Sequence, residues 1–176
     1  MTTSTLHHTT FASPLGALDL YASDGALVAA YFAEHRHRPR LVASAAPEHA
    51  VLRQACEQLH EYFCGARRDF SVPLAARGTA FQHEVWRALR DIPFGAVRSY
   101  AELARAIARP EASRAVGAAN GRNPLSIFVP CHRVIGSSGE LTGYAGGLAA
   151  KRWLLEHERG ATSPAFKAAA SPHAGT

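Results

Sequence analysis

The stretch that most constrains this chain covers residues 127–135 and reads IFVPCHRVI. An apolar, β-branched run that ends at a proline is typical of a buried strand, because proline cannot donate to a sheet ladder and fixes the backbone. We therefore expect Cys131 to be held rigidly at the rim of a core. A cysteine reacts as its thiolate, and His132 and Arg133 place a base and a cation beside it in sequence. The alternative is a structural cysteine that caps a strand.

Charge divides the chain into two parts. Residues 1–77 hold seven Lys/Arg and seven Asp/Glu, whereas residues 78–176 hold twelve and seven, so the whole net charge of +5 lies in the second part. Five arginines fall within residues 98–122. A one-sided basic surface is typical of a nucleic-acid binder, and a solvated basic face that binds nothing is the alternative.

The sequence carries no sign of a membrane segment or of secretion. No apolar run approaches membrane-spanning length, and residues 1–10 lack the basic-then-apolar order of a signal peptide. The three cysteines, Cys56, Cys64 and Cys131, are an odd number without metal-site spacing. This pattern favours a reducing compartment over a disulfide framework, so we expect a cytoplasmic protein with no membrane partner.

Residues 1–77 are predicted to form a small N-terminal α/β domain. Two strands, residues 15–21 and 26–32, are separated by Ser23-Asp24-Gly25, which is a hairpin signal. Residues 48–63 carry apolar side chains three to four positions apart, which predicts a helix. Together these segments predict a short antiparallel sheet with one helix packed on it.

Three further expectations concern the same domain. Cys56 lies on the apolar stripe of the predicted helix, so we expect it to be buried, and residues 70–74 offer a third strand. Residues 1–10 are polar and are expected to be disordered. A zinc role for His7 and His8 would need further ligands, and nothing nearby supplies them.

Residues 78–160 are predicted to form a second, mainly helical domain, with Trp86 in its core. Helix, short turn and helix, with arginines on the second helix, is a helix-turn-helix pattern, although many helical hairpins bind nothing. A last helix is expected over residues 149–157, and residues 161–176 are expected to be a disordered tail. Two helices are predicted to begin with capping boxes: Thr79 and Gln82 precede a helix over residues 81–91, and Ser99 and Glu102 precede a helix that ends near residue 108. A turn at Arg109-Pro110 then precedes a third helix over residues 111–119.

Four sequence blocks keep their order in this second part: SRAVGAANGRNP (113–124), PCHRV (130–134), TGYAGGL (142–148) and KRWLLEHE (151–158). These blocks resemble those of the methylated-DNA–protein-cysteine methyltransferases, the O6-alkylguanine repair proteins. The resemblance implies an α/β protein in which a small N-terminal domain, a short antiparallel sheet with a helix, precedes a mainly helical C-terminal domain with a helix-turn-helix.

The resemblance also implies a reaction. A thiolate at Cys131 displaces the purine oxygen of O6-methylguanine from the methyl carbon in one step, and the thioether product is permanent. Each molecule then acts once, and neither a cofactor nor a metal is expected. In the family the cysteine passes its proton through a water to the adjacent histidine, which a glutamate orients. The matching residues are Cys131, His132 and Glu158; acceptance of O4-methylthymine stays open.

Five positions are implied to form the base pocket. Tyr100 matches a tyrosine whose hydroxyl donates to the flipped purine, and Tyr144 matches an aromatic wall. Asn123 matches an asparagine that braces the turn before the reactive cysteine. Backbone groups at that cysteine and at Val134 would read the amino edge of guanine. Ala145 departs from relatives that have serine there, so only its backbone amide is available to the purine oxygen.

The resemblance places DNA contacts on the second helix of the helix-turn-helix. Arg114 matches an arginine that enters the base stack and fills the space of the flipped nucleotide. The small residues Ala115 and Ala118 would let this helix approach the minor groove closely. Arg122 and Arg98 are implied to contact phosphates. The expected partner is double-stranded DNA that contains O6-alkylguanine, bound by a monomer.

Two other functions compete with this interpretation. The first is a non-catalytic binder of alkylated DNA, because relatives exist in which the reactive cysteine is replaced; Cys131 argues against it. The second is a thiol hydrolase that uses Cys131 and His132, but no oxyanion-hole motif or acyl-substrate signature supports it. The N-terminal part also lacks the cysteine set that some relatives use for zinc or for accepting methyl groups from phosphates.

Overall fold

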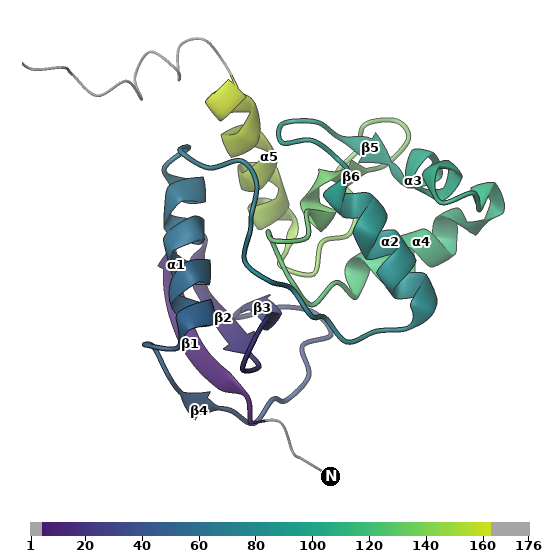
Figure 1. The fold of residues 1–176 in the computed structure, drawn as a ribbon. Coiled ribbons are helices and arrows are strands. Elements are labelled where there is room, and N and C mark those ends of the chain that lie inside the picture. Colours follow the sequence, from purple (N-terminus) through teal and green to yellow (C-terminus); the bar gives the residue numbers. More distant parts are fainter. Residues whose placement is uncertain (1–4, 163–176) are drawn as a thin grey trace, which may run out of the picture.

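The computed structural model describes residues 5–162 (Figure 1). Its N-terminal part is a four-stranded sheet with strand order β3-β2-β1-β4, and one face of the sheet packs against a helix. β1 pairs antiparallel with β2 and parallel with β4, and β2 pairs antiparallel with β3. The predicted small α/β fold is confirmed. Its elements are β1 (His7–Ser13), β2 (Gly16–Ala22), β3 (Leu27–Phe32), β4 (Ser44–Ala45) and α1 (Ala50–Phe63).

Apolar side chains are buried on both faces of the sheet, because successive side chains of a strand point to opposite sides. Leu18 and Leu20 are fully buried in the main core, whereas Tyr21, on the other face, packs with Ala29 and Tyr31 in a smaller cluster. The helix closes the first face with an apolar stripe at helical spacing. The buried residues of α1 are Val51, Leu52, Ala55, Gln58, Leu59 and Tyr62.

The structure corrects three expectations for this domain. Residues 7–10 are not disordered: they form the first half of β1, whose backbone is satisfied by β2 on one side and β4 on the other. Their polarity therefore reflects a partly exposed strand, not an unfolded one. Residues 70–74 supply only an isolated bridge from Leu74 to Leu27, not a strand. Cys56 is half-buried at the edge of the core, not buried.

The C-terminal part is helical, and both predicted capping boxes are present in it, at Thr79 and Ser99. The helix-turn-helix consists of α3 and α4, which contact each other and pack with α2. Trp86 is buried and donates through its indole N–H to the carbonyl of Ala119 at 2.9 Å, which ties α2 to α4. The elements are α2 (Ala80–Arg90), β5 (Arg98–Ser99), α3 (Tyr100–Ala106), η1 (Pro110–Ala112), α4 (Ser113–Gly121), η2 (Cys131–Arg133), β6 (Val134–Ile135) and α5 (Leu148–Thr162).

The predicted buried strand before the cysteine is not formed. Residues 127–129 are buried, but they make a tight turn in which Ile127 has a positive φ of 73° and Ser126 bridges Val129. Asn123 satisfies this turn by accepting from the Leu125 N–H and donating to the Val129 carbonyl. Such side-chain hydrogen bonds offer the backbone an alternative to a sheet ladder. The turn leads into a short 3-10 helix, and Cys131 is its first residue.

The last helix joins the two parts of the molecule. α5 stands between α1 and the helices of the C-terminal part, and it contacts η2 (Figure 1). It continues to Thr162, five residues beyond the predicted end at His157. The prediction of a disordered tail from residue 161 is therefore wrong for residues 161 and 162, whose backbone continues the helix, and residues 163–176 lie outside the described residues. No helix within residues 5–162 is long and apolar enough to cross a membrane.

Candidate active site

The thiol of Cys131 is held inside the protein by the turn that precedes it. The residue is 2% exposed, and the amide of Asn123 donates to its Sγ at 3.1 Å. The same amide group donates to the Val129 carbonyl at 2.9 Å, so one side chain fixes both the turn and the sulfur. Burial raises the pKa of the Cys131 thiol, and the Asn123 bond and the charge of Lys151 act against that rise. The resting group is a protonated thiol that needs a base.

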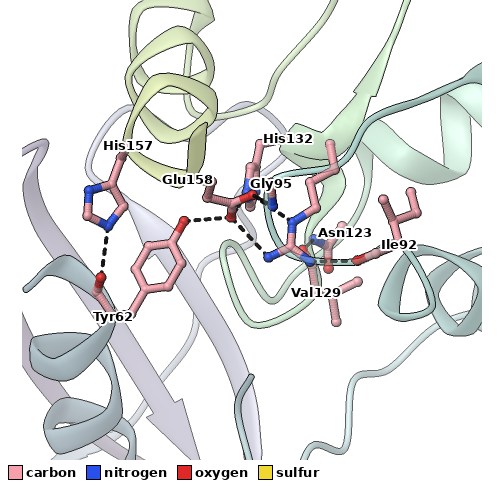
Figure 2. Close-up of polar contacts among 9 residues, drawn as sticks. Tyr62, Ile92, Gly95, Asn123, Val129, His132, His157 and Glu158 are labelled. Carbon is pink, nitrogen blue, oxygen red and sulfur yellow. Dashed lines mark hydrogen bonds and ion pairs between the residues drawn. The ribbon is translucent and has the colours of Figure 1, made fainter. Parts of the chain in front are cut away.

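The base next to it belongs to a buried ionic network centred on Glu158 of α5 (Figure 2). His132 Nε2 lies 2.7 Å from one carboxylate oxygen of Glu158. Arg133 donates from Nε and from a terminal nitrogen to the two carboxylate oxygens, at 2.9 Å each, and also donates to the Ile92 carbonyl at 2.7 Å. Tyr62 of α1 donates its hydroxyl to Glu158 at 2.8 Å. The network thus joins η2, α5 and α1.

The electrostatics of this network set the protonation of His132. Burial alone would raise the pKa of Glu158, but His132 and Arg133 outweigh it and hold that pKa well below the ordinary range. Because the carboxylate accepts at Nε2, the imidazole carries its hydrogen there, and Nδ1 keeps a lone pair. Burial lowers the pKa of His132, so the ring is neutral at physiological pH. Nδ1 is buried and has no hydrogen-bond partner among the described residues.

A buried lysine supplies a second charge beside the thiol. Lys151 of α5 is fully buried, and its ammonium group donates to the carbonyls of Val134 and Thr142. Burial lowers its pKa to about 8, against the attraction of Cys131. The bond to Thr142 holds the glycine-rich loop, residues 136–147, against α5.

A cavity of about 600 Å³ opens between α4 and the glycine-rich segment 143–147, and Cys131 is not among the residues that line it. Tyr100 and Tyr144 line it; burial raises the pKa of both phenols, and ionisation of Cys131 to the thiolate would raise both further. Tyr144 packs edge-on against Phe32 of β3, and Gly146 lies so close to both rings that a Cβ there would clash with them. The full lining is Arg36, His37, Tyr100, Gly117, Ala118, Gly121, Arg122, Gly143, Tyr144, Ala145, Gly147 and Leu148.

The candidate DNA face is the exposed side of α4. Arg114 and Ala118 are both exposed and four residues apart, so they share one helix face. Ala115 is exposed next to them, and Arg122 stands at the end of the helix on the cavity wall. Arg98 is exposed in β5, but it lines a separate surface depression with Glu102 and Arg105. The structure thus gathers four of the five predicted DNA contacts around α4 and places Arg98 apart.

Sequence reasoning missed several residues of this site. Arg36 and His37 reach the cavity from the loop after β3, and the Arg36 N–H donates to the Ala145 carbonyl at 2.8 Å. Lys151 lies within the KRWLLEHE block, but its spacing alone gives no sign that it is buried. Tyr62 lies within the predicted helix over residues 48–63, where the apolar spacing predicts packing and gives no sign of its bond to Glu158. Arg133 was considered as a cation for the thiol, whereas it pairs with Glu158.

Comparison with protein families gives two matches that together cover most of the chain. Residues 6–76 match the ribonuclease-like domain of 6-O-methylguanine DNA methyltransferase, and residues 80–160 match its DNA-binding domain. A curated methylated-DNA–protein-cysteine methyltransferase of Mycobacterium tuberculosis is 47% identical over 154 residues, 88% of this chain and 93% of that protein. One from Methanosarcina acetivorans is 44% identical over 153 residues, 87% of this chain and 98% of that protein.

Solved structures agree with the sequence matches. The crystal structure of Mycobacterium tuberculosis OGT in complex with DNA superimposes with a TM-score of 0.85 at 46% identity, and the match covers 88% of this chain and 94% of that one. A crystal structure of the Mycobacterium tuberculosis O6-methylguanine methyltransferase gives a TM-score of 0.83 at 44% identity, covering 93% and 98%. The similarity therefore includes the N-terminal part, where sequence blocks were lacking.

Proposed function

The chain belongs to the methylated-DNA–protein-cysteine methyltransferase family, and from this premise we propose that it repairs DNA by moving the methyl group of O6-methylguanine onto Cys131. It is a DNA-repair methyltransferase that acts by direct reversal of the damage. The observation that carries the assignment of Cys131 is that its sulfur accepts from the Asn123 amide at 3.1 Å and that the next residue, His132, is a neutral histidine whose Nδ1 is unpaired among residues 5–162.

The reaction begins with removal of the thiol proton. That proton passes from Cys131 Sγ through a bridging water to His132 Nδ1, because this nitrogen carries the lone pair. The resulting imidazolium is stabilised by the ionised Glu158 at 2.7 Å. The Asn123 amide and the Lys151 ammonium group favour the thiolate. The site therefore has a base, an orienting carboxylate and two groups that stabilise the nucleophile.

The thiolate then attacks the methyl carbon. A carbon–sulfur bond forms while the bond between that carbon and the purine oxygen breaks, and the electron pair of the broken bond goes to the purine. The Tyr100 hydroxyl, on the cavity wall, donates to the Thr142 carbonyl at 3.3 Å in the structure and turns to donate to the purine as it takes up this charge. The backbone amide of Ala145 faces the leaving oxygen. The product is S-methylcysteine, which no second nucleophile removes, so each molecule acts once.

The buried thiol requires the damaged base to leave the duplex. α4 lies against the minor groove with its small residues Ala115 and Ala118, and Arg114 occupies the space that the everted nucleotide leaves. Arg122 contacts a phosphate at the cavity edge, and Arg36 adds a cation from the N-terminal part. The cavity between Tyr144 and α4 receives the base.

The partner in this proposal is duplex DNA that contains O6-alkylguanine. We propose that the protein acts as a monomer. The cysteines Cys56, Cys64 and Cys131 are all free thiols in the structure, which fits a reducing compartment, and we place the protein in the cytoplasm.

Transfer of a labelled methyl group tests the proposal. Duplex DNA with one labelled O6-methylguanine is mixed with excess protein, and the label is traced to protein, DNA and solution. The proposal expects the label in the protein and none released. Label that stays on DNA while the protein binds would indicate a non-catalytic binder, and label released into solution would indicate a hydrolase.

A further inference from the structure

A second, smaller pocket shares no lining residue with the cavity of the proposed active site. Its walls are residues 68–70 of the segment that joins α1 to α2, Arg90 at the end of α2, and residues within 127–133, around Cys131. The ring centroids of Phe70 and Phe128 lie 4.6 Å apart, which holds the first wall against the third. The pocket has a volume of about 170 Å³. Pockets for drug-sized ligands measure about 300–1,000 Å³, so this one suits a single small group.

Arg133 is the buried cation of this pocket, and only 5% of the residue is exposed. Its guanidinium group donates twice to Glu158 and once to the Ile92 carbonyl. A guanidinium group has five N–H donors, so two are left over. Neither has a partner among the described residues. Arg133 therefore keeps donor capacity for a ligand in addition to its bonds to Glu158 and Ile92.

Arg68 and Arg90 add two exposed cations to the pocket. Within residues 5–162, neither forms an ion pair or a side-chain hydrogen bond. The Arg68 guanidinium group lies 5.5 Å from the centroid of the Phe94 ring, and that of Arg133 lies 5.7 Å from the same centroid. The ring attracts both cations, whereas the cations repel each other. An anion in the pocket that both line would offset this repulsion.

The acidic groups near the pocket do not balance these charges. Asp69 is the one acidic side chain among the described residues that line it, and it forms no ion pair with either exposed arginine. Glu158 offsets the charge of Arg133, at 2.9 Å. Two unpaired guanidinium groups therefore stand against one carboxylate. This balance favours an anionic ligand over a metal cation.

We propose that this pocket binds a phosphate group, either as free inorganic phosphate or as the phosphate of a mononucleotide. The planar fork of a guanidinium group matches the oxygen atoms of phosphate, and the two negative charges of the group suit two uncompensated arginines. A bound phosphate would connect the segment between α1 and α2 to the turn before Cys131. It would thereby stabilise the folded chain. The binding is separate from methyl transfer.

Titration of the full chain with inorganic phosphate, followed by calorimetry at fixed ionic strength, tests this proposal. We expect one equivalent to bind and to raise Tm by about 5–10 °C at about a hundredfold excess over its Kd. Neither measurement involves alkylated DNA, so a failure here leaves the proposed function untouched. A protein that binds no equivalent of phosphate, and whose Tm does not rise, would overturn the proposal.

Variants separate this pocket from other basic surfaces. Arg68→Gln and Arg90→Gln should each weaken phosphate binding about tenfold, because each removes a charged donor. Asp69→Asn should tighten binding about threefold, because it removes a repelling charge. All three side chains are exposed, so the variants should fold, and their Tm without phosphate verifies this. Arg87→Gln, on the exposed side of α2, and Glu57→Gln, on α1, are controls that should bind as the parent does.

Thymidine 5′-monophosphate, titrated in the same way, identifies the source of the phosphate group. Binding at least tenfold tighter than that of inorganic phosphate supports a mononucleotide, whereas equal or weaker binding supports free phosphate. Affinity that is unchanged in both arginine variants would indicate an adventitious ion only and would overturn the proposal. Unchanged affinity in Asp69→Asn would equally contradict the placement of the anion in this pocket.

Discussion

Tyr62 of α1 donates a 2.8 Å hydrogen bond to Glu158 of α5, although the two residues are 96 positions apart (Figure 2). His157, the neighbour of Glu158, in turn contacts the Tyr62 carbonyl at 2.8 Å. The helix of the N-terminal part therefore holds the carboxylate that orients the proposed base. We propose that this contact gives the N-terminal part a direct role in the active site, beyond packing.

Replacing Tyr62 with phenylalanine tests that role. The change leaves a buried carboxylate oxygen of Glu158 with one donor fewer. We therefore expect the free energy of unfolding to fall by about 1–3 kcal/mol and methyl transfer to slow. Urea unfolding and single-turnover transfer measure the two effects. Tyr31→Phe, a buried tyrosine of β3 remote from Glu158, is the control. A Tyr62→Phe protein with the parent's transfer rate would show that α1 contributes packing alone.

Glu158→Gln should affect both stability and its dependence on pH. The change leaves Arg133 buried without its anion, which costs about 3–5 kcal/mol. The folded-state pKa values of Glu158 and His132 both lie below their ordinary values of 4.5 and 6.5. The unfolded chain therefore binds more protons in acid, so stability is full above pH 6.5 and falls as pH decreases.

Urea unfolding between pH 8 and pH 4 measures this dependence. The parent should lose stability steadily below pH 6.5, and Glu158→Gln should flatten the slope below about pH 5. Glu156→Gln, an exposed neighbour on α5, should keep the parent's slope. Parent stability that is constant or that rises in acid would contradict the assigned protonation states.

Lys151→Met tests whether the buried ammonium group favours the thiolate. Its loss should raise the pKa of Cys131, and each unit of that rise lowers the thiolate fraction tenfold. Because burial puts the pKa of Lys151 at about 8, the parent's rate advantage should be largest below pH 8 and should vanish as pH rises through that value. A rate deficit independent of pH would indicate a structural role. Arg152→Met, at the exposed neighbour, is the control.

Arg114→Ala tests the proposed base eversion. Arg114 is exposed on α4 and lies outside the cavity lining, so it cannot contribute to the chemistry of an isolated base. We expect methyl transfer from duplex DNA to slow far more than transfer from free O6-methylguanine. Arg109→Ala, whose side chain pairs with Glu84 on another surface, is the control. Equal slowing for both substrates would show that Arg114 does not fill the space of the everted nucleotide in the base stack.

Local signals in the sequence predicted local structure well. Thr79 and Ser99 open helices where their capping boxes placed them, because a cap depends only on residues within one turn. The α/β architecture and the family were also predicted, since sequence blocks and hydrophobic periodicity both carry them. The strand β1 was not predicted because its polar residues carry no strand signal of their own. It forms because β2 and β4 pair with it.

Non-local contacts explain what the sequence did not reveal at the site. The turn before Cys131 is set by hydrogen bonds from Asn123, so an apolar run that favours a strand forms none. Arg36 and His37 approach the cavity where the loop after β3 meets the segment that contains Ala145, and Tyr62 approaches Glu158 where α1 meets α5. These contacts join parts of the chain whose spacing in sequence carries no signal.

The most direct test of the account is the mass of the intact protein after reaction with duplex DNA that contains O6-methylguanine. We predict a single methyl addition per molecule, located at Cys131 by peptide mapping, stable over time and absent in Cys131→Ser. Ethyl and benzyl lesions, measured in the same way, define the size of group that the cavity accepts. An unchanged mass after the parent protein has bound the lesion, or a methyl group on another residue, would contradict the account.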